Sequence, residues 1–193
     1  MLKEKLQHKR IILASGSPRR QQFFREMDID FTIQIKEVEE IYPKELEASA
    51  ITKFLAELKA NAFDSLEEND LLITSDTIVW HENKALGKPK DAKDAFQMLQ
   101  SLSGKTHEVI TSVCFKTKNK LETLTETTKV TFNSLCDEAI HYYISNYKPF
   151  DKAGSYGIQE WIGLIGISKI EGSYTNVVGL PVEKVYQKLY QYV

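Results

Sequence analysis

Apolar and polar positions alternate between strand-like and helical spacing along the first half of the chain. Ile11–Ala14 is a short apolar run that predicts a buried strand. Ser17 followed by Pro18 is typical of a helix start, with serine as the cap and proline in the first turn. Apolar positions over Ile51–Ala62 repeat with helical period, and Leu71–Thr74 predicts a second buried strand. Strands and helices therefore follow one another here as in a parallel sheet.

The second half of the chain has a different pattern, in which two long strands follow each other directly. His107–Lys116 and Leu121–Phe132 predict a hairpin. Parallel connections early and a hairpin late predict a mixed sheet, of α/β or α+β class. A length of 193 residues predicts one domain, or one domain folded as two lobes around a cleft. The remaining predicted elements are a strand at Phe31–Ile35, helices at Ala92–Leu102, Asp137–Tyr147 and after Pro181, and a strand at Leu164–Ile170.

Charge and composition narrow the classes of function. Lys plus Arg is 25 and Asp plus Glu is 27, so the net charge is −2 and creates no general attraction for nucleic acid or anionic membrane. The longest apolar stretch, Trp161–Ile167, is far shorter than a membrane span, and the apolar run near the N-terminus is too short for a signal peptide. We expect a cytoplasmic protein whose anionic ligands are bound locally.

Two adjacent arginines occupy an unusual position. Arg19 and Arg20 fall in the first turn of the predicted helix, whose positive end disfavours cations by about 0.3–1 kcal/mol each. A small-residue loop containing Ser15 and Ser17, a helix N-terminus and two guanidinium groups together suit phosphate oxygens. Two solvated arginines remain the alternative. Ser17 is better interpreted as a helix cap than as a nucleophile, because Arg19 replaces the glycine that a nucleophile elbow requires.

Asp76 follows an apolar strand directly, where side chains of α/β proteins commonly face a ligand. Its carboxylate could bind Mg²⁺ or orient a water molecule, or simply cap a turn. Glu40 belongs to a small acidic group at residues 37–40 that would ordinarily be solvated. If Glu40 faces the same site, the two carboxylates provide the oxygen ligands that Mg²⁺ or Mn²⁺ requires.

Two lysines add candidate phosphate contacts. Lys59 lies at the margin of a buried helical stripe, from which it could cover apolar surface or reach a ligand. Lys88 lies between Gly87 and Pro89 in a rigid turn, and an ordinary surface loop is an equally good interpretation. The four histidines show no zinc-binding spacing.

Six short segments of the chain form an ordered set: residues 13–20, 75–79, 87–89, 102–107, 151–159 and 176–181. In this order and spacing they resemble the Maf family of nucleoside triphosphate pyrophosphatases, and the resemblance extends over nearly the whole chain. This resemblance implies hydrolysis of a nucleoside triphosphate to the monophosphate and pyrophosphate with a divalent metal. It also implies a homodimer and a two-lobed mixed α/β fold similar to inosine triphosphate pyrophosphatases, with a central active-site cleft.

The resemblance also implies roles for individual residues. Asp76 matches the proton acceptor, and Arg20, Glu40, Lys59 and Lys88 match polar active-site positions of the family. Glu40 and Asp76 would hold Mg²⁺ or Mn²⁺.

Three further positions bear on the substrate. Arg19, Thr77 and Gln159 match residues of family members that act on dTTP and UTP. The 7-methyl-GTP subgroup differs in the segments that correspond to residues 17–20 and 157–159. A glutamine amide can both donate and accept, which matches the O4 and N3–H edge of uracil and thymine. Tyr147–Lys148 departs from the Gly-Glu that often precedes the next proline in the family.

Other functions stay open at this point. A nucleotide-binding regulator linked to cell division, which does not hydrolyse its ligand, would have similar residues. A 7-methyl-GTP-type pyrophosphatase is a second alternative. Nucleic-acid binding is disfavoured, because basic runs with interleaved aromatic residues are absent.

Overall fold

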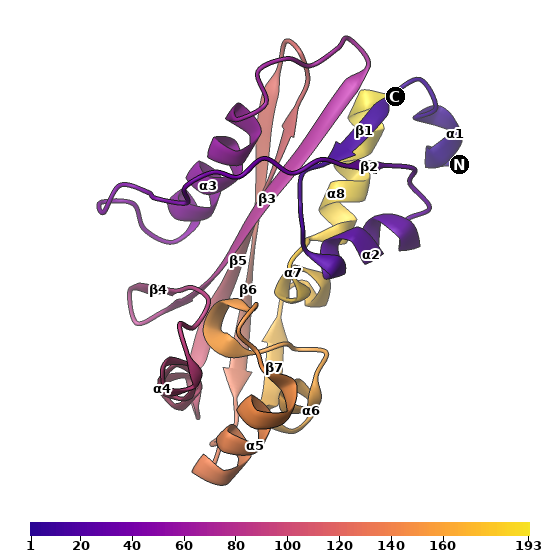
Figure 1. Cartoon of the computed structure of the whole chain (residues 1–193). Coiled ribbons are helices and arrows are strands. Elements are labelled where there is room, and N and C mark those ends of the chain that lie inside the picture. The colour runs from indigo at the N-terminus through magenta and orange to yellow at the C-terminus, as the bar shows by residue number, and fades with distance from the viewer. The chain divides into compact units, whose positions relative to one another are not determined.

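The computed structural model describes all 193 residues, Met1–Val193 (Figure 1). The helices are α1 (Leu2–Lys5), α2 (Pro18–Glu26), α3 (Ser49–Asn61), α4 (Ala92–Leu102), α5 (Asp137–Tyr147), α6 (Trp161–Gly166), α7 (Tyr174–Val178) and α8 (Val182–Leu189), with 3₁₀ turns at Ala153–Ser155 and Tyr190–Tyr192. The strands are β1 (Arg10–Leu13), β2 (Thr32–Ile33), β3 (Asp70–His81), β4 (Lys84–Leu86), β5 (Thr106–Lys116), β6 (Leu121–Phe132) and β7 (Ile167–Glu171).

Seven strands form one mixed sheet, as the sequence predicts. The hydrogen-bonded order is β2-β1-β3-β5-β6-β7, and β4 pairs with β3. Strand β1 is parallel to both β2 and β3, whereas β3 with β4 and β6 with β7 are antiparallel. The α/β class is therefore confirmed.

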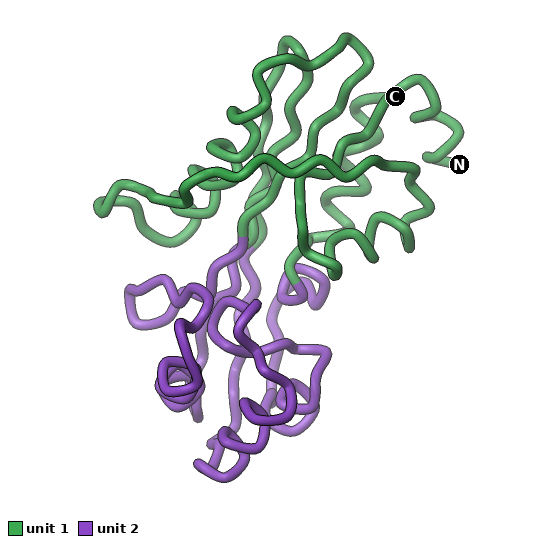
Figure 2. Tube along the Cα trace, viewed as in Figure 1, with its two compact units in different colours: residues 1–76, 111–126, 179–193 green, residues 77–110, 127–178 purple.

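The chain divides into two compact units, drawn in different colours in Figure 2, and neither is a single stretch of sequence. Unit 1 comprises Met1–Asp76, Thr111–Glu126 and Gly179–Val193. Unit 2 comprises Thr77–Ile110 and Thr127–Val178. Strand β3 passes from unit 1 to unit 2 between Asp76 and Thr77, and β5 and β6 also contribute residues to both.

The strands of unit 1 are apolar on both faces because helices cover both. Leu13 and Ile73 belong to a core cluster with residues of α2 and α8, whereas Ile12 and Leu72, the alternate positions, pack with residues of α3. Side chains of a strand alternate between faces, so burial on both faces produces the continuous apolar runs in the sequence.

A separate apolar cluster fills unit 2. Side chains of α4 and α5, among them Leu99 and Tyr143, pack with Phe132 of β6 and with Ile158. Each of these side chains is at most 5% exposed. None of the helices in the structure combines the length and the apolar character needed to cross a bilayer.

Three predicted strands differ from the structure. The strand predicted at Leu71–Thr74 forms the longer strand Asp70–His81, so Asp76 lies within β3 and does not follow it. The strand predicted at Leu164–Ile170 begins only at Ile167, because Trp161–Gly166 forms helix α6. The absence of a side chain at Gly163 allows the helix to approach the backbone of Ile158, where a Cβ would lie 1.9 Å from its carbonyl oxygen. At Phe31–Ile35, only Thr32–Ile33 pairs with β1.

Candidate active site

The loop between β1 and α2 forms a capped helix start in unit 1. The Ser17 side chain accepts a hydrogen bond from the Arg20 N–H at 3.5 Å, and the Ser15 hydroxyl accepts one from the Ser17 N–H at 3.3 Å. The cap interpretation of Ser17 is confirmed. Because the Ser17 oxygen accepts from the helix backbone, its position is set by the fold of the loop.

Arg20 extends from this helix start to two backbone carbonyls. Its Nε donates to the Gly179 oxygen at 2.9 Å, and its Nη1 donates to the Ser75 oxygen at 3.1 Å. Burial lowers the pKa of Arg20 and Arg19 adds to this effect, whereas Asp76 and Glu40 act in the opposite direction. The planar guanidinium is thus fixed beside the middle of β3.

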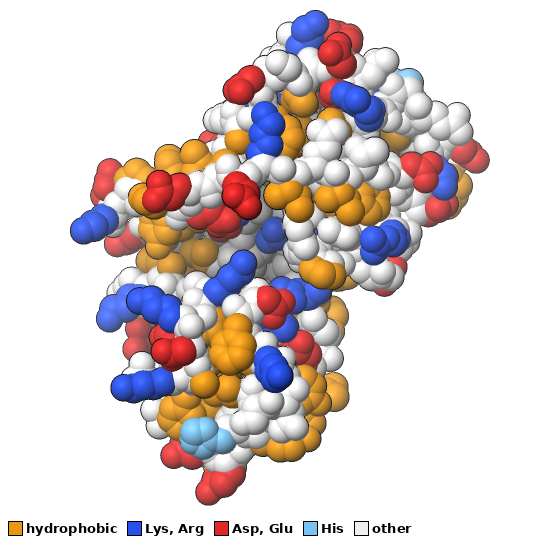
Figure 3. Space-filling view, viewed as in Figure 1, with side chains coloured by type: hydrophobic (Ala, Val, Ile, Leu, Met, Phe, Trp, Pro, Cys, Tyr) orange, Lys and Arg blue, Asp and Glu red, His pale blue; other side chains and the backbone are white.

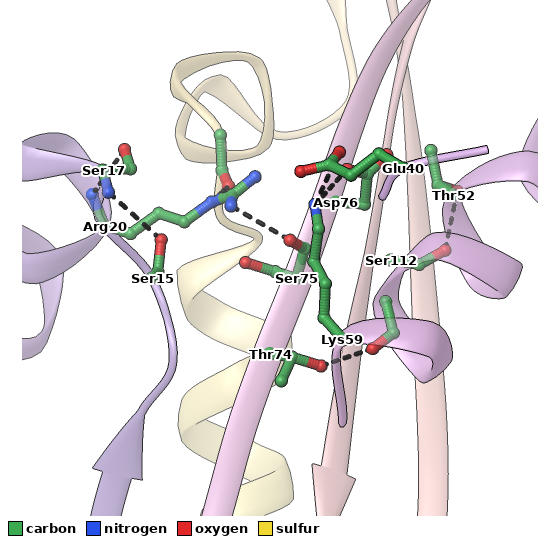
Figure 4. Close-up of polar contacts among 12 residues, drawn as sticks. Ser15, Ser17, Arg20, Glu40, Thr52, Lys59, Thr74, Ser75, Asp76 and Ser112 are labelled. Atoms are coloured by element: carbon green, nitrogen blue, oxygen red, sulfur yellow. Dashed lines mark hydrogen bonds and ion pairs between the residues drawn. The ribbon is translucent and has the colours of Figure 1, made fainter. Parts of the chain in front are cut away.

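Lys59 joins two carboxylates at the same place (Figure 4). Its Nζ lies 2.7 Å from Asp76 Oδ1 and 3.0 Å from Glu40 Oε2. The Asp76 side chain is 8% exposed, whereas that of Glu40 is 53% exposed. Glu40 therefore provides a carboxylate that solvent can reach, and Asp76 provides one that the protein surrounds.

Buried hydroxyl groups attach α3 to the sheet and so fix the backbone position of Lys59. Thr74 Oγ1 donates to the Ala56 carbonyl oxygen at 2.6 Å, and the hydroxyls of Thr52 and Ser112 share a hydrogen bond of 2.7 Å. These contacts tie the helix to β3 and β5 along the turns that precede Lys59 (Figure 4). A buried hydrogen bond of this kind adds about 1 kcal/mol and restricts sliding of the helix.

Two buried oxygen atoms in the middle of β3 have no hydrogen-bond partner. They are Asp76 Oδ2 and Ser75 Oγ. An unpartnered carboxylate oxygen inside a protein is costly, by about 1–3 kcal/mol or more. Such an atom, with the second carboxylate on Glu40, fits a divalent cation of the Mg²⁺ type, which takes one or two protein carboxylates and fills its shell with water and phosphate oxygens.

The structure thus brings together four of the predicted residues, Arg20, Glu40, Lys59 and Asp76, within unit 1. Ser15 and Ser17 lie in the loop that precedes Arg20, and Arg19 lies beside Arg20 on α2.

Three further predicted residues belong to unit 2. Thr77 is the first residue of that unit on β3. Lys88 is exposed in the loop between β4 and α4, and the carbonyl oxygen of its neighbour Gly87 accepts a hydrogen bond from the Gly154 N–H at 3.0 Å. Gln159 is exposed in a turn formed by residues 157–160.

Sequence reasoning gave no role to the residues whose carbonyls hold Arg20. Gly179 has a φ of 126°, a conformation that side chains rarely allow, and its oxygen meets a guanidinium 159 positions earlier in the chain. The only sequence signal is that Gly179 lies within one of the six quoted segments.

Comparison with known proteins identifies the family of the chain. The model of the family described as Maf-like protein matches residues 10–192. The chain belongs to the Maf family. A Flavobacterium johnsoniae protein named dTTP/UTP pyrophosphatase is 68% identical over 190 residues, which is 98% of each chain. A Christiangramia forsetii protein of the same name is 57% identical, over 98% of this chain and 97% of that protein.

Two solved structures of Ham1 proteins are similar in fold to this Maf-family chain. The Staphylococcus aureus Ham1 protein superposes with a TM-score of 0.54 at 15% identity, covering 93% of this chain and 100% of that one. A HAM1 protein from Coxiella burnetii gives a TM-score of 0.51 at 14% identity, with 95% and 99% covered. At these identities the likeness concerns the fold alone.

Proposed function

We propose that the protein is a nucleoside triphosphate pyrophosphatase that hydrolyses dTTP and UTP to the monophosphate and pyrophosphate. The names of relatives up to 68% identical over nearly the whole chain support the reaction and the substrates. The observation that carries the proposal is the cluster at the middle of β3, where Arg20 and Lys59 adjoin the carboxylates of Glu40 and Asp76.

The residues of the cluster divide the work of hydrolysis. Asp76 accepts the proton of a water molecule whose oxygen attacks the α-phosphorus. The bond between the α-phosphorus and the bridging oxygen breaks, and pyrophosphate leaves with the electron pair. Arg20 and Lys59 stabilise the negative charge of the triphosphate chain, which makes catalysis largely a matter of position and electrostatics. Lys88 of unit 2 is proposed to contribute another positive charge.

Glu40 and Asp76 would hold Mg²⁺ or Mn²⁺. When bound, such a cation neutralises phosphate charge and makes a coordinated water more acidic. The proposal predicts that activity is lost on removal of divalent cations with EDTA and returns when Mg²⁺ or Mn²⁺ is added. A chain that releases pyrophosphate equally well without divalent ions would contradict this role for the two carboxylates.

The base is proposed to contact residues other than the charged cluster. Gln159 would donate to O4 and accept from N3–H of uracil or thymine, and Arg19 and Thr77 are proposed as further substrate contacts. Ser15 and Ser17, in the loop at the start of α2, are proposed to lie close to the phosphates.

One assay separates this proposal from its rivals. The purified chain is incubated with dTTP, UTP, CTP, GTP and 7-methyl-GTP plus Mg²⁺, and pyrophosphate release is followed. We expect turnover of dTTP and UTP well above the others. Binding of dTTP without pyrophosphate release would indicate a nucleotide-binding regulator, and preference for 7-methyl-GTP would indicate the other subgroup.

Several properties accompany the proposal. We place the protein in the cytoplasm, where its substrates occur, and expect a homodimer that sedimentation velocity can identify. Positive and negative side chains are interspersed on the face drawn in Figure 3, which fits a net charge of −2. We therefore propose no nucleic-acid partner.

A further inference from the structure

Within unit 2, Gln159 lies at the tip of a tight turn whose other residues are held in place. The Glu160 N–H donates to the Gly157 carbonyl oxygen at 3.0 Å and closes the turn. Ile158 is 5% exposed and belongs to the apolar cluster of unit 2, whereas Gln159 is exposed. The turn therefore places one side chain in the core and presents the next one outward.

The hydroxyl of Tyr143 joins the two ends of this turn. It accepts a hydrogen bond from the Gly157 N–H at 3.0 Å and donates one to Glu160 Oε2. The other carboxylate oxygen of Glu160 lies 3.1 Å from Lys152 Nζ, which also pairs with Asp151 at 2.7 Å. Because Tyr143 is fully buried in α5, its hydroxyl is a fixed point for the turn.

The opposite side of the turn is fixed by close packing against α6. A Cβ on Gly163 would lie 1.9 Å from the Ile158 carbonyl oxygen and 2.5 Å from its carbonyl carbon. The Gly163 and Leu164 N–H groups donate to the Glu160 carbonyl oxygen at 2.9 and 3.3 Å. With helix α6 on this side and Tyr143 at its ends, the turn has little freedom to move.

We propose that Tyr143 is a positioning residue for base selection, because its hydroxyl fixes the turn that presents Gln159. This inference rests on the proposed function, in which Gln159 contacts the base. Discrimination by hydrogen bonds depends on the donor and acceptor being held in one geometry, so a loosened turn loses selectivity before it loses turnover. Burial and Glu160 both raise the pKa of Tyr143, so its hydroxyl keeps the proton that it donates.

The test compares Tyr143→Phe with Tyr142→Phe. Tyr142 precedes Tyr143 on α5, and its side chain is substantially exposed. Tyr143→Phe keeps the ring in the core and removes only the hydroxyl. The values of kcat and KM are measured for UTP and CTP, together with inhibition by inorganic tripolyphosphate, which carries no base.

For Tyr143→Phe we expect the ratio of kcat/KM for UTP over CTP to fall about tenfold, mainly through a higher KM for UTP. Inhibition of Tyr143→Phe by tripolyphosphate should stay within about twofold of that of the unsubstituted protein. The UTP over CTP ratio of Tyr142→Phe should also stay within about twofold of the unsubstituted value. An unchanged UTP over CTP ratio, or equal weakening of UTP, CTP and tripolyphosphate, would overturn the inference.

A second pair of variants covers the case in which Tyr143→Phe does not fold. Glu160→Gln keeps an oxygen that accepts from the Tyr143 hydroxyl, whereas Glu160→Met removes it. We expect Glu160→Met to lose selectivity and Glu160→Gln to retain most of it. Equal selectivity in the two variants would contradict the positioning role.

Gln159→Ala distinguishes failure of the inference from failure of the proposed function. If Gln159→Ala lowers the UTP over CTP ratio and neither Tyr143→Phe nor Glu160→Met does, only the inference is wrong. If Gln159→Ala itself leaves the ratio unchanged, the proposed base contact is wrong and the inference falls with it.

Discussion

The charged cluster of unit 1 and the Gly157–Glu160 turn of unit 2 are held by different forces. In the cluster, one lysine pairs with two carboxylates, and a partly buried arginine is held by carbonyl groups. In the turn, a tyrosine hydroxyl and apolar packing hold the backbone, and the one side chain presented outward is an uncharged amide.

This difference determines what a substitution should change. Removing one charge from the cluster leaves its neighbours without compensation and alters the electrostatics of the reaction itself. Removing one hydrogen bond from the turn alters the precision with which an amide is placed. We therefore expect rate effects from the charged cluster and selectivity effects from the Gly157–Glu160 turn, and the predictions below test that division.

The largest effect is expected for Asp76→Asn. An amide cannot take the proton from water and binds a divalent cation poorly, so kcat for dTTP should fall about 100-fold or more. The fold should persist, because asparagine has nearly the same size. Pyrophosphate release is measured alongside Asp30→Asn, which changes an exposed aspartate of the same unit. Near-normal turnover of folded Asp76→Asn would remove Asp76 from the mechanism.

Arg20→Lys tests whether geometry matters beyond charge. A lysine keeps the positive charge but cannot donate to the Gly179 and Ser75 carbonyls in the planar arrangement of a guanidinium. We expect kcat/KM for dTTP to fall about 30-fold. Arg25→Lys on the exposed part of the same helix serves as the control and should have almost no effect. Equal activity of the two variants would show that charge alone is enough.

The cluster was partly predictable from the sequence, for physical reasons. Arg20 was identifiable because cations in the first turn of a helix are unfavourable unless something compensates them. Asp76 was identifiable because a carboxylate follows an apolar run, but the expectation that the strand ends before it is wrong, since β3 continues to His81. Glu40 could not be chosen from residues 37–40 by chemistry, since that segment has no periodic pattern. The contact of the Gly179 carbonyl with Arg20 could not be predicted, because only the fold brings the two residues together.

The turn was less predictable. The helix at Asp137–Tyr147 was predictable, but the sequence does not show that Tyr143 is fully buried while its neighbour Tyr142 is 49% exposed. It also says nothing about the partners of the Tyr143 hydroxyl. Helix α6 was missed because a short apolar run favours strand and helix equally, and the packing of Gly163 against Ile158 decided between them.

The apolar core of unit 2 has a consequence at acid pH. Burial, with a smaller effect of His81, lowers the pKa of His107 to about 3, and its Nε2 shares a hydrogen bond of 2.7 Å with the Tyr156 hydroxyl. The unfolded chain binds a proton at this histidine below pH about 6.5, whereas the folded chain does not. Stability is therefore lost as the pH falls from 6.5 towards 3.

The loss attributable to His107 should be about 2 kcal/mol at pH 5 relative to pH 7. Urea unfolding of the parent and of His107→Gln at both pH values measures it, because the variant lacks this titration. His141→Gln changes an exposed histidine of the same unit and should keep the pH dependence of the parent. If the His107→Gln chain loses as much stability as the parent between pH 7 and pH 5, this histidine is not the cause.

The smallest effect is expected for Gln159→Glu, and it tests the selectivity half of the comparison most directly. A carboxylate can accept from N3–H but cannot donate to O4, so kcat/KM for dTTP and UTP should fall about tenfold. Gln100→Glu adds the same charge at an exposed position of α4 and controls for general repulsion of the triphosphate. Inhibition by tripolyphosphate should be similar in both variants. If Gln159→Glu lowers kcat/KM for GTP as much as for UTP, the added charge acts on the phosphates. The division between a charged cluster that determines rate and a turn that determines selectivity is then wrong.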